Sequence, residues 1–306
     1  MKKAILIYNP KSGNQKFENK LDYVINSLKQ KYDDVLVCRT NHPGHATEFA
    51  KEACEDKYDL MVIVGGDGTF NECVNGIMEY SERPLIGYIP AGTCCDIGMS
   101  LGLSKNVEKA IKNILENTSA KMDVVKSNNR YFCYVSGNGA FIDISYVTNS
   151  NLKKRIGYLA YLIRGAVELF TIPKMKMKIR HDNGVEKGTY SLVLIINSKR
   201  VAGINMIYKP CLDDGLVDVV LYRSFPPMNA IIYMVSMIIP FWSTPLIRRF
   251  KSKKLEIKTN TKATWNIDGE SGGTGNQYIE VCQKAIEVII PKTIQNKYFH
   301  HQNEDL

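Results

Sequence analysis

The sequence lacks several features that would place it in a specialised class of protein. It has no internal repeat with a period of about 20 to 50 residues, and its 22 glycines and 11 prolines among 306 residues exclude a collagen-like chain. No two cysteines have the CxxC spacing of a zinc site. The apolar start at 4–7 is too short for the core of a secretory signal, so we expect none.

The composition is that of an ordinary globular protein. Hydrophobic residues make up 44% and charged residues 23%, which excludes a wholly disordered chain. The 8 cysteines lie in apolar or helical stretches rather than in an evenly spaced loop framework. This distribution predicts reduced thiols and a cytoplasmic protein.

The net charge favours anionic partners. Lysine and arginine total 40 against 31 acidic residues, which gives +9. No zinc finger or aromatic RNA-binding pattern is present, so we predict no nucleic-acid partner. Nucleotide phosphate and acidic lipid remain as the anions to consider.

Two domains are expected from the order of the elements. In 1–125, short apolar strands alternate with segments of helical periodicity, which predicts a parallel α/β domain covered by helices on both faces. In 126–292, short β-like runs separated by turns predict a mainly antiparallel β-sandwich, interrupted by helices near 153–170 and 229–239. The polar residues 293–306 are expected to form a tail that packs back on the first domain.

The most apolar segment runs from Ala230 to Trp242. It is too short to span a bilayer, and Pro240 interrupts it, so we predict no transmembrane segment. It is either a buried helix or a surface element that touches membrane or a lipid tail. Basic residues at 248–254 favour the second reading, although a solvated basic face explains such a run as well.

The strongest chemical signal is the run Gly65-Gly66-Asp67-Gly68-Thr69-Phe70-Asn71-Glu72. It follows a predicted strand and opens a predicted helix. Glycines there allow backbone N–H groups to approach phosphate oxygens, and the helix N-terminus adds positive potential. No Gly-Lys-Ser/Thr follows, so the run is not a Walker A loop.

Two further turns follow predicted strands. They are Asn9-Pro10-Lys11-Ser12-Gly13 and Pro90-Ala91-Gly92-Thr93-Cys94-Cys95-Asp96. Ligands of parallel sheets bind outside the carboxyl ends of the strands, and all three turns are expected there. The convergence of three turns carries more weight than any one of them.

Together with residues further along the chain, these turns resemble the diacylglycerol kinase catalytic-domain family, specifically soluble bacterial lipid kinases related to sphingosine kinases. The further matches are Thr40, Gly44-His45-Ala46, Asp123, Gly157…Tyr161, Asp214 to Val219 and Asp268-Gly269-Glu270. Taken alone, the last motif would indicate only a β-turn. The Gly-Gly-Asp-Gly-Thr element is shared with NAD kinases and phosphofructokinases, whereas the ordered set is far more specific.

The resemblance implies transfer of phosphate from MgATP to a lipid hydroxyl in a cleft between the two domains. Diacylglycerol is the expected acceptor, with sphingoid bases or phosphatidylglycerol as alternatives. Such an enzyme would contact the membrane surface peripherally during turnover. The resemblance leaves a homodimer open.

Site residues follow from the same resemblance. Those implied to contact ATP are Asn9, Pro10, Lys11, Ser12, Gly13, Thr40, Gly66, Asp67, Gly68, Thr69, Phe70, Asn71, Glu72 and Thr93. Glu270 would accept the proton of the lipid hydroxyl. Asp67, Asp96 and Asp123 would surround the catalytic Mg²⁺, directly or through water. A second, structural Mg²⁺ would be held by the carboxylate of Asp214 and the backbone carbonyls of Cys211 and Leu216.

One departure from the family pattern keeps other functions open. The asparagine that usually precedes Asp96 is Cys95 here, and a thiol is a much poorer hydrogen-bonding partner. A nucleotide- or lipid-binding protein with little catalysis is therefore one alternative, although the intact acidic residues argue against it. A kinase of a soluble acceptor such as NAD is the other.

Overall fold

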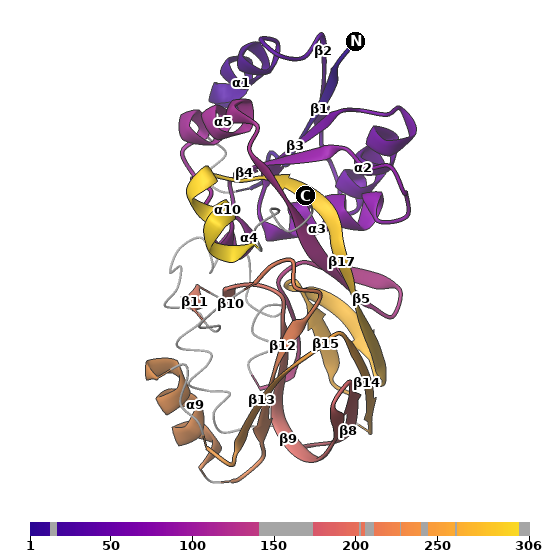
Figure 1. Cartoon of the computed structure of the whole chain (residues 1–306), viewed down its shortest axis with the longest axis vertical. Coiled ribbons are helices and arrows are strands. Elements are labelled where there is room, and N and C mark those ends of the chain that lie inside the picture. Colours follow the sequence, from indigo (N-terminus) through magenta and orange to yellow (C-terminus); the bar gives the residue numbers. More distant parts are fainter. Residues whose placement is uncertain are drawn as a thin grey trace, which may run out of the picture.

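A parallel sheet forms the core of the N-terminal half of the molecule (Figure 1). The computed structural model describes residues 1–12, 17–140, 174–201, 203–205, 211–226, 228–239, 244–260 and 262–299. The parallel strands are β1 (Lys3–Tyr8), β2 (Asp34–Arg39), β3 (Leu60–Gly65) and β4 (Leu85–Pro90), in the order β4-β3-β1-β2. Both β1 and β3 are almost entirely buried, which explains their unbroken apolar sequences.

Helices cover both faces of this sheet because neighbouring strand residues point in opposite directions. Ile5 and Ile7 pack in one core with α2 (His45–Glu55) and α3 (Asp67–Ile77). Ala4 and Leu6 pack in another core with α1 (Leu21–Leu28) and α5 (Val107–Glu116). The remaining helical elements of this half are η1 (Glu18–Lys20) and α4 (Asp96–Ser100).

The C-terminal half is a mostly antiparallel β-structure around a third apolar core that includes Trp265. Its strands are β5 (Ser119–Ser127), β6 (Arg130–Phe132), β7 (Val135–Gly139), β8 (Met175–His181), β9 (Gly184–Ile196), β10 (Arg200–Val201), β11 (Ile204–Asn205), β12 (Val217–Arg223), β13 (Ile247–Ser252), β14 (Lys254–Thr259), β15 (Thr264–Ile267), β16 (Glu270–Thr274) and β17 (Gln277–Ile289). Helix α9 (Asn229–Ile238) packs on β12 through the rings of Tyr233 and Tyr222.

The strand β17 joins the two halves (Figure 1). Its first residues pair with β14, while Val288 pairs with Ile86 of the parallel sheet. Strand β5 accompanies β17 along most of its length, so one sheet runs through both halves. The predicted fold class, a parallel α/β half followed by a mainly antiparallel β-half, is confirmed. The predicted boundary at residue 125 stays a prediction, and it falls within β5.

The end of the chain returns to the N-terminal half. Helix α10 (Lys292–Tyr298) follows β17, and the side chains of Tyr298 and Phe299 are buried in the core that holds α2 and α3. Residues 300–306 of the expected tail and the expected helix at 153–170 lie outside the described residues. In the part of the chain that the structure describes, no helix is long and apolar enough to cross a membrane.

Candidate active site

The turns after β1, β3 and β4 meet at the carboxyl edge of the parallel sheet. A Cβ added to Gly92 would lie 2.7 Å from the Cα of Gly66, so the turns after β3 and β4 are in backbone contact. The side-chain amide of Asn9 donates a 3.3 Å hydrogen bond to the hydroxyl of Thr69, which joins the first turn to them. The expected convergence is therefore found. The N-terminus of α3 opens beside it, a position that favours a bound anion.

Asp67 connects the second turn to the third. Its two carboxylate oxygens accept hydrogen bonds from the backbone N–H groups of Asp96 and Ile97, both at 3.0 Å, at the start of α4. Burial raises the pKa of Asp67, while these two N–H groups oppose the rise. The neighbouring charge of Asp96 raises the pKa further. Asp67 and Asp96 are thus an electrostatically interacting pair, as a shared Mg²⁺ site requires.

Asp96 reaches from α4 to the hairpin of β10 and β11. Its side chain is buried, and its Oδ1 accepts a 3.0 Å hydrogen bond from the backbone N–H of Gly203. The guanidinium Nε of Arg200 lies 3.9 Å from the same oxygen. Protein donors thus already surround this carboxylate, which suits contact with a metal through water rather than through a direct bond. Asp67 and Asp96 therefore fit Mg²⁺ held through water better than through direct bonds.

The structure places Asp123 in a different environment. It lies opposite a bulge in β17, and its carboxylate accepts hydrogen bonds from the backbone N–H groups of Lys284 and Gly215, both at 2.7 Å. Burial raises the pKa of Asp123 to about 6, with further contributions from Asp214 and Asp213. Asp123 is therefore grouped with the acidic turn before β12: its Oδ1 holds the bulge at Lys284 and its Oδ2 holds the turn at Gly215.

The acidic turn before β12 contains the ligands expected for a structural Mg²⁺. The Nζ of Lys251 lies 2.7 Å from Oδ2 of Asp214, whose Oδ1 accepts a hydrogen bond from the backbone N–H of Leu216. The thiol of Cys211 donates to Asp213. Oxygen ligands suit Mg²⁺ chemically. However, the ammonium of Lys251 already neutralises Asp214, so a metal ion would have to displace it.

Glu270 stands over the start of α3. A Cβ added to Gly68 would lie 3.7 Å from its Oε1, and its Oε2 forms a 2.8 Å ion pair with Arg130. The Glu270 side chain is 38% exposed and thus accessible to a ligand. Although about 200 residues separate them in sequence, the structure brings the expected proton acceptor next to the glycine-rich turn.

Asp268 is a functional candidate to which the sequence had assigned no role. Its buried carboxylate accepts hydrogen bonds from the backbone N–H groups of Cys133, Tyr134 and Val135, and from the side-chain amide of Asn71 at 2.8 Å. Burial raises the pKa of Asp268 to about 7 against the effect of these donors. By tying α3 to the β15–β16 turn, Asp268 positions Glu270. In the sequence, only the Asp268-Gly269-Glu270 motif pointed to Asp268.

Several residues implied to contact ATP face the protein instead. Phe70 is buried and packs on Tyr88, and the amide of Asn71 is engaged by Asp268. The carboxylate of Glu72 accepts a hydrogen bond from the backbone N–H of Ala46 and so stabilises the start of α2. These residues hold the turn in place rather than form its open surface.

The remaining implied contacts lie near the edge of the sheet. Thr40 is buried and bonded to Tyr8, Pro10 and Ser12 are partly exposed, and Lys11 is exposed. Gly13 lies outside the described residues. Thr93 is exposed, and Lys105 donates to its carbonyl oxygen at 2.6 Å. Lys105 therefore supplies a positive charge to the third turn that no motif predicted.

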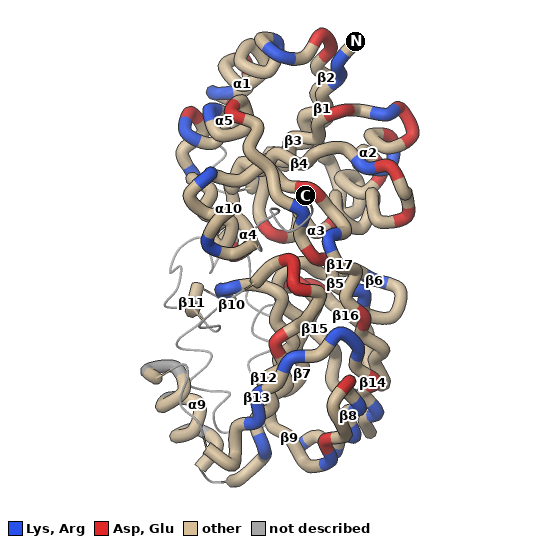
Figure 2. Tube along the Cα trace, in the orientation of Figure 1, with Lys and Arg blue, Asp and Glu red and all other residues tan. Residues whose placement is uncertain are grey.

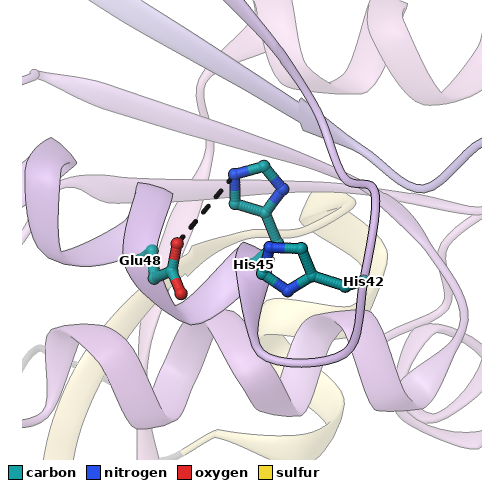
Figure 3. Close-up of side chains that lie close together, drawn as sticks. All are labelled: His42, His45 and Glu48. Carbon is teal, nitrogen blue, oxygen red and sulfur yellow. Dashed lines mark ion pairs between the residues drawn. The ribbon is translucent and has the colours of Figure 1, made fainter.

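Two histidines lie at the start of α2, beside Ala46 (Figure 3). The candidate ligand atoms of His42, His45 and Glu48 all lie within 4.8 Å of one another. The two rings stack with an angle of 7°, so their in-plane lone pairs cannot converge on one ion. The Nδ1 of His45 accepts a hydrogen bond from the backbone N–H of Asn41, which leaves its proton on Nε2, facing Glu48. This group is a stacked pair beside a carboxylate rather than a preformed metal site.

Comparisons with known proteins agree with this arrangement. Residues 3–127 match the model of the diacylglycerol kinase catalytic domain, and residues 138–290 match that of the YegS C-terminal NAD kinase beta sandwich-like domain. The chain is 33% identical to a diacylglycerol kinase of Staphylococcus carnosus over 96% of this chain and 97% of that protein. It is 32% identical to a diacylglycerol kinase of Staphylococcus epidermidis over 97% of this chain and 94% of that protein.

A solved structure from Bacillus anthracis has the same architecture. That protein, described as a candidate diacylglycerol kinase, superposes with a TM-score of 0.84 at 28% identity and covers 96% of this chain and 98% of its own. The similarity therefore extends through both halves of the molecule.

Proposed function

Because the chain belongs to the diacylglycerol kinase family, a family of ATP-dependent lipid kinases, we propose that it phosphorylates diacylglycerol to phosphatidic acid with MgATP. One observation supports this more than any other. The carboxylate of Glu270 lies over Gly68 at the N-terminus of α3, next to the turn that carries Asp67. A candidate base and a candidate phosphate site are therefore adjacent.

The phosphates of ATP bind at the turns after β3 and β4. The close approach of Gly66 and Gly92 exposes backbone there without side chains, and the N-terminus of α3 provides positive potential. Lys105 adds a cation at the carbonyl groups of the third turn. These groups orient the γ-phosphate toward Glu270.

Asp67 and Asp96 are the residues that would hold the catalytic Mg²⁺. When bound, Mg²⁺ neutralises charge on the phosphates during transfer. Asp123 fixes the chain at Gly215 and Lys284, beside the turn of Asp214, Cys211 and Leu216 that would hold a structural Mg²⁺ if the ion displaced Lys251.

Glu270 accepts the proton of the lipid hydroxyl as the oxygen attacks the γ-phosphorus. Its ion pair with Arg130 orients the carboxylate. In a loose transition state the hydroxyl loses its proton late, so a carboxylate is a sufficient base. Asp268 acts through position, because it anchors the turn before Glu270 to α3.

The experiment measures transfer of labelled γ-phosphate from ATP to diacylglycerol in mixed micelles. Glu270→Gln should lower kcat by about 100-fold or more, since a general base contributes about 10² to 10⁴-fold. Glu256→Gln is the matched control, because Glu256 is 37% exposed and also pairs with an arginine, Arg180. Its activity should equal that of wild type.

Each alternative function has its own outcome in this assay. Label entering NAD rather than lipid would establish a kinase of a soluble acceptor. Binding of ATP without label in any acceptor would establish a binding protein. Full activity of Glu270→Gln would remove Glu270 as the base while leaving the lipid kinase in place.

A further inference from the structure

Helix α9 is apolar on two opposite faces and carries no charged residue (Figure 2). Its inner face is buried on β12, where Ile232 and Tyr233 are each 3% exposed. On its outer side, Ile231 is 49% exposed and Ile239, directly after the helix, is 53% exposed. A surface helix of a water-soluble domain ordinarily presents polar residues outward. The outer side of α9 therefore needs an apolar environment.

Exposed apolar side chains are concentrated at this helix. Nine large hydrophobic residues are exposed in the described part of the chain, and four of them belong to α9 and its flanking residues. These four are Phe225, Met228, Ile231 and Ile239. The other five are distributed along the chain from Met1 to Tyr278. Scattered exposed residues need no explanation, whereas exposed apolar side chains that gather on one element indicate an interaction site.

Arginines border this patch. A depression of about 650 Å³ is lined by Arg223, Arg248 and Arg249 together with one acidic residue, Glu186. Glu186 pairs with Arg248 at 3.0 Å, so three positive charges against one negative leave an excess of two. Because Arg223 precedes Phe225 by two residues, the charged depression and the apolar patch adjoin. In Figure 2, α9 carries no charged residue, whereas β13 carries several basic ones.

The basic residues expected to act together at 248–254 have different surroundings in the structure. Lys251 is paired with Asp214, and Lys254 is paired with Glu280. Arg249 and Arg248, the latter paired with Glu186, line the depression. Trp242, at the end of the expected apolar segment, lies outside the described residues.

We propose that the four apolar residues and the three arginines form one surface, here called the α9 surface, that docks on an anionic lipid bilayer. This inference rests on the proposed function, since a diacylglycerol kinase must reach a substrate held in a membrane. An interfacial helix sinks its apolar side about 5–10 Å into the headgroup region. Arginines beside it then meet lipid phosphates, with which guanidinium groups form paired hydrogen bonds.

Charge favours a bilayer over a second copy of the chain as the occupant. A two-fold symmetric contact through the α9 surface would place the same arginines of two chains near one another. An anionic bilayer instead neutralises their excess charge. The bilayer therefore satisfies both the apolar and the charged part of the surface.

The test is co-sedimentation of the full chain with phosphatidylcholine vesicles that contain about 30% phosphatidylglycerol, compared with phosphatidylcholine alone. Wild type should bind the anionic vesicles more tightly. The double variant Arg248→Gln/Arg249→Gln should bind them about 25-fold more weakly, because each arginine near an anionic surface contributes about fivefold. The double variant Met228→Gln/Ile231→Gln should bind the anionic vesicles about tenfold or more weakly, because it can no longer bury two large apolar side chains in the bilayer.

Matched controls separate this surface from general charge and hydrophobicity. Lys176→Gln/Lys258→Gln removes two positive charges from β8 and β14, and Leu36→Gln removes an exposed apolar residue from β2. Both should bind vesicles as wild type does. An unchanged thermal unfolding temperature shows that each α9 variant is folded.

Three results would overturn the proposal. The first is binding of the α9 variants at the level of wild type, and the second is equal binding of wild type to neutral and anionic vesicles. The third is a wild-type dimer in analytical ultracentrifugation that the Met228→Gln/Ile231→Gln variant dissociates, since the surface would then be a subunit interface. Sedimentation does not depend on turnover, and phosphorylation of a short-chain diacylglycerol in micelles tests the proposed function separately.

Discussion

Replacement of Gly92 by alanine should force apart the two turns that form the proposed phosphate site. A Cβ at this position would lie 2.7 Å from the Cα of Gly66 and 3.2 Å from the Sγ of Cys95. Ordinary contacts begin near 3.4 Å, so the backbone has to move by about 0.7 Å. Since the closest neighbour is backbone, a change of rotamer cannot relieve the contact. Overpacking of this kind costs about 1–3 kcal/mol of unfolding free energy.

Gly66→Ala is the matched control for this prediction. Its added Cβ would lie 3.5 Å from Gly92, and Gly66 has an extended backbone that any residue adopts. Its unfolding free energy should stay within about 0.5 kcal/mol of wild type. Urea denaturation measures the unfolding free energy of both variants. ATP titration should show that Gly92→Ala binds ATP at least tenfold more weakly than wild type does. Equal stability of Gly92→Ala and wild type would refute the contact between the two turns.

Three further predictions concern the acidic residues and their partners. Arg130→Gln should lower kcat by about tenfold while the KM for ATP changes little, because it removes the ion pair that orients Glu270; steady-state kinetics measure both. Lys251→Met should lower the thermal unfolding temperature in EDTA, and added Mg²⁺ should restore it, since the lysine neutralises Asp214; no response to Mg²⁺ would argue against a metal there. Burial raises the pKa of Asp268 to about 7, so the folded protein holds this proton more tightly than the unfolded chain. The stability that Asp268 contributes relative to Asp268→Asn should therefore decline from about pH 4 to pH 7, and urea denaturation at pH 5 and pH 8 measures the difference.

Local sequence predicted the parts of the fold that depend on local patterns. The apolar runs of β1 and β3 are buried on both faces, so their strands were evident from composition alone. The meeting of the glycine turns was also predictable, because parallel strands bring their carboxyl ends to one edge. The role of Glu270 came only from the family resemblance, since Asp-Gly is a common turn pair.

Positions that depend on distant pairing could not be predicted in the same way. Asp123 clamps Lys284, 161 residues away, because β5 pairs with β17 across a bulge. The sequence shows neither the register nor the bulge. Asp268 likewise looks like a solvated turn residue until the fold buries it against α3. Cys95 adopts a left-handed backbone conformation, with φ of 54°, which no local signal at a cysteine indicates.

The passage of β17 through both halves has a mechanical consequence. Since β5 and β17 are hydrogen-bonded on either side of the bulge between Cys282 and Ile286, the halves cannot separate without bending this pair of strands. The bulge is the interruption in the ladder, and it marks the place where bending costs the fewest hydrogen bonds. Asp123 stiffens that point by holding Lys284. The stiffness of the β5–β17 pair at this bulge, together with the ties from Asp268 to Asn71 and from Asp96 to Gly203, therefore limits how far the two halves can move relative to one another.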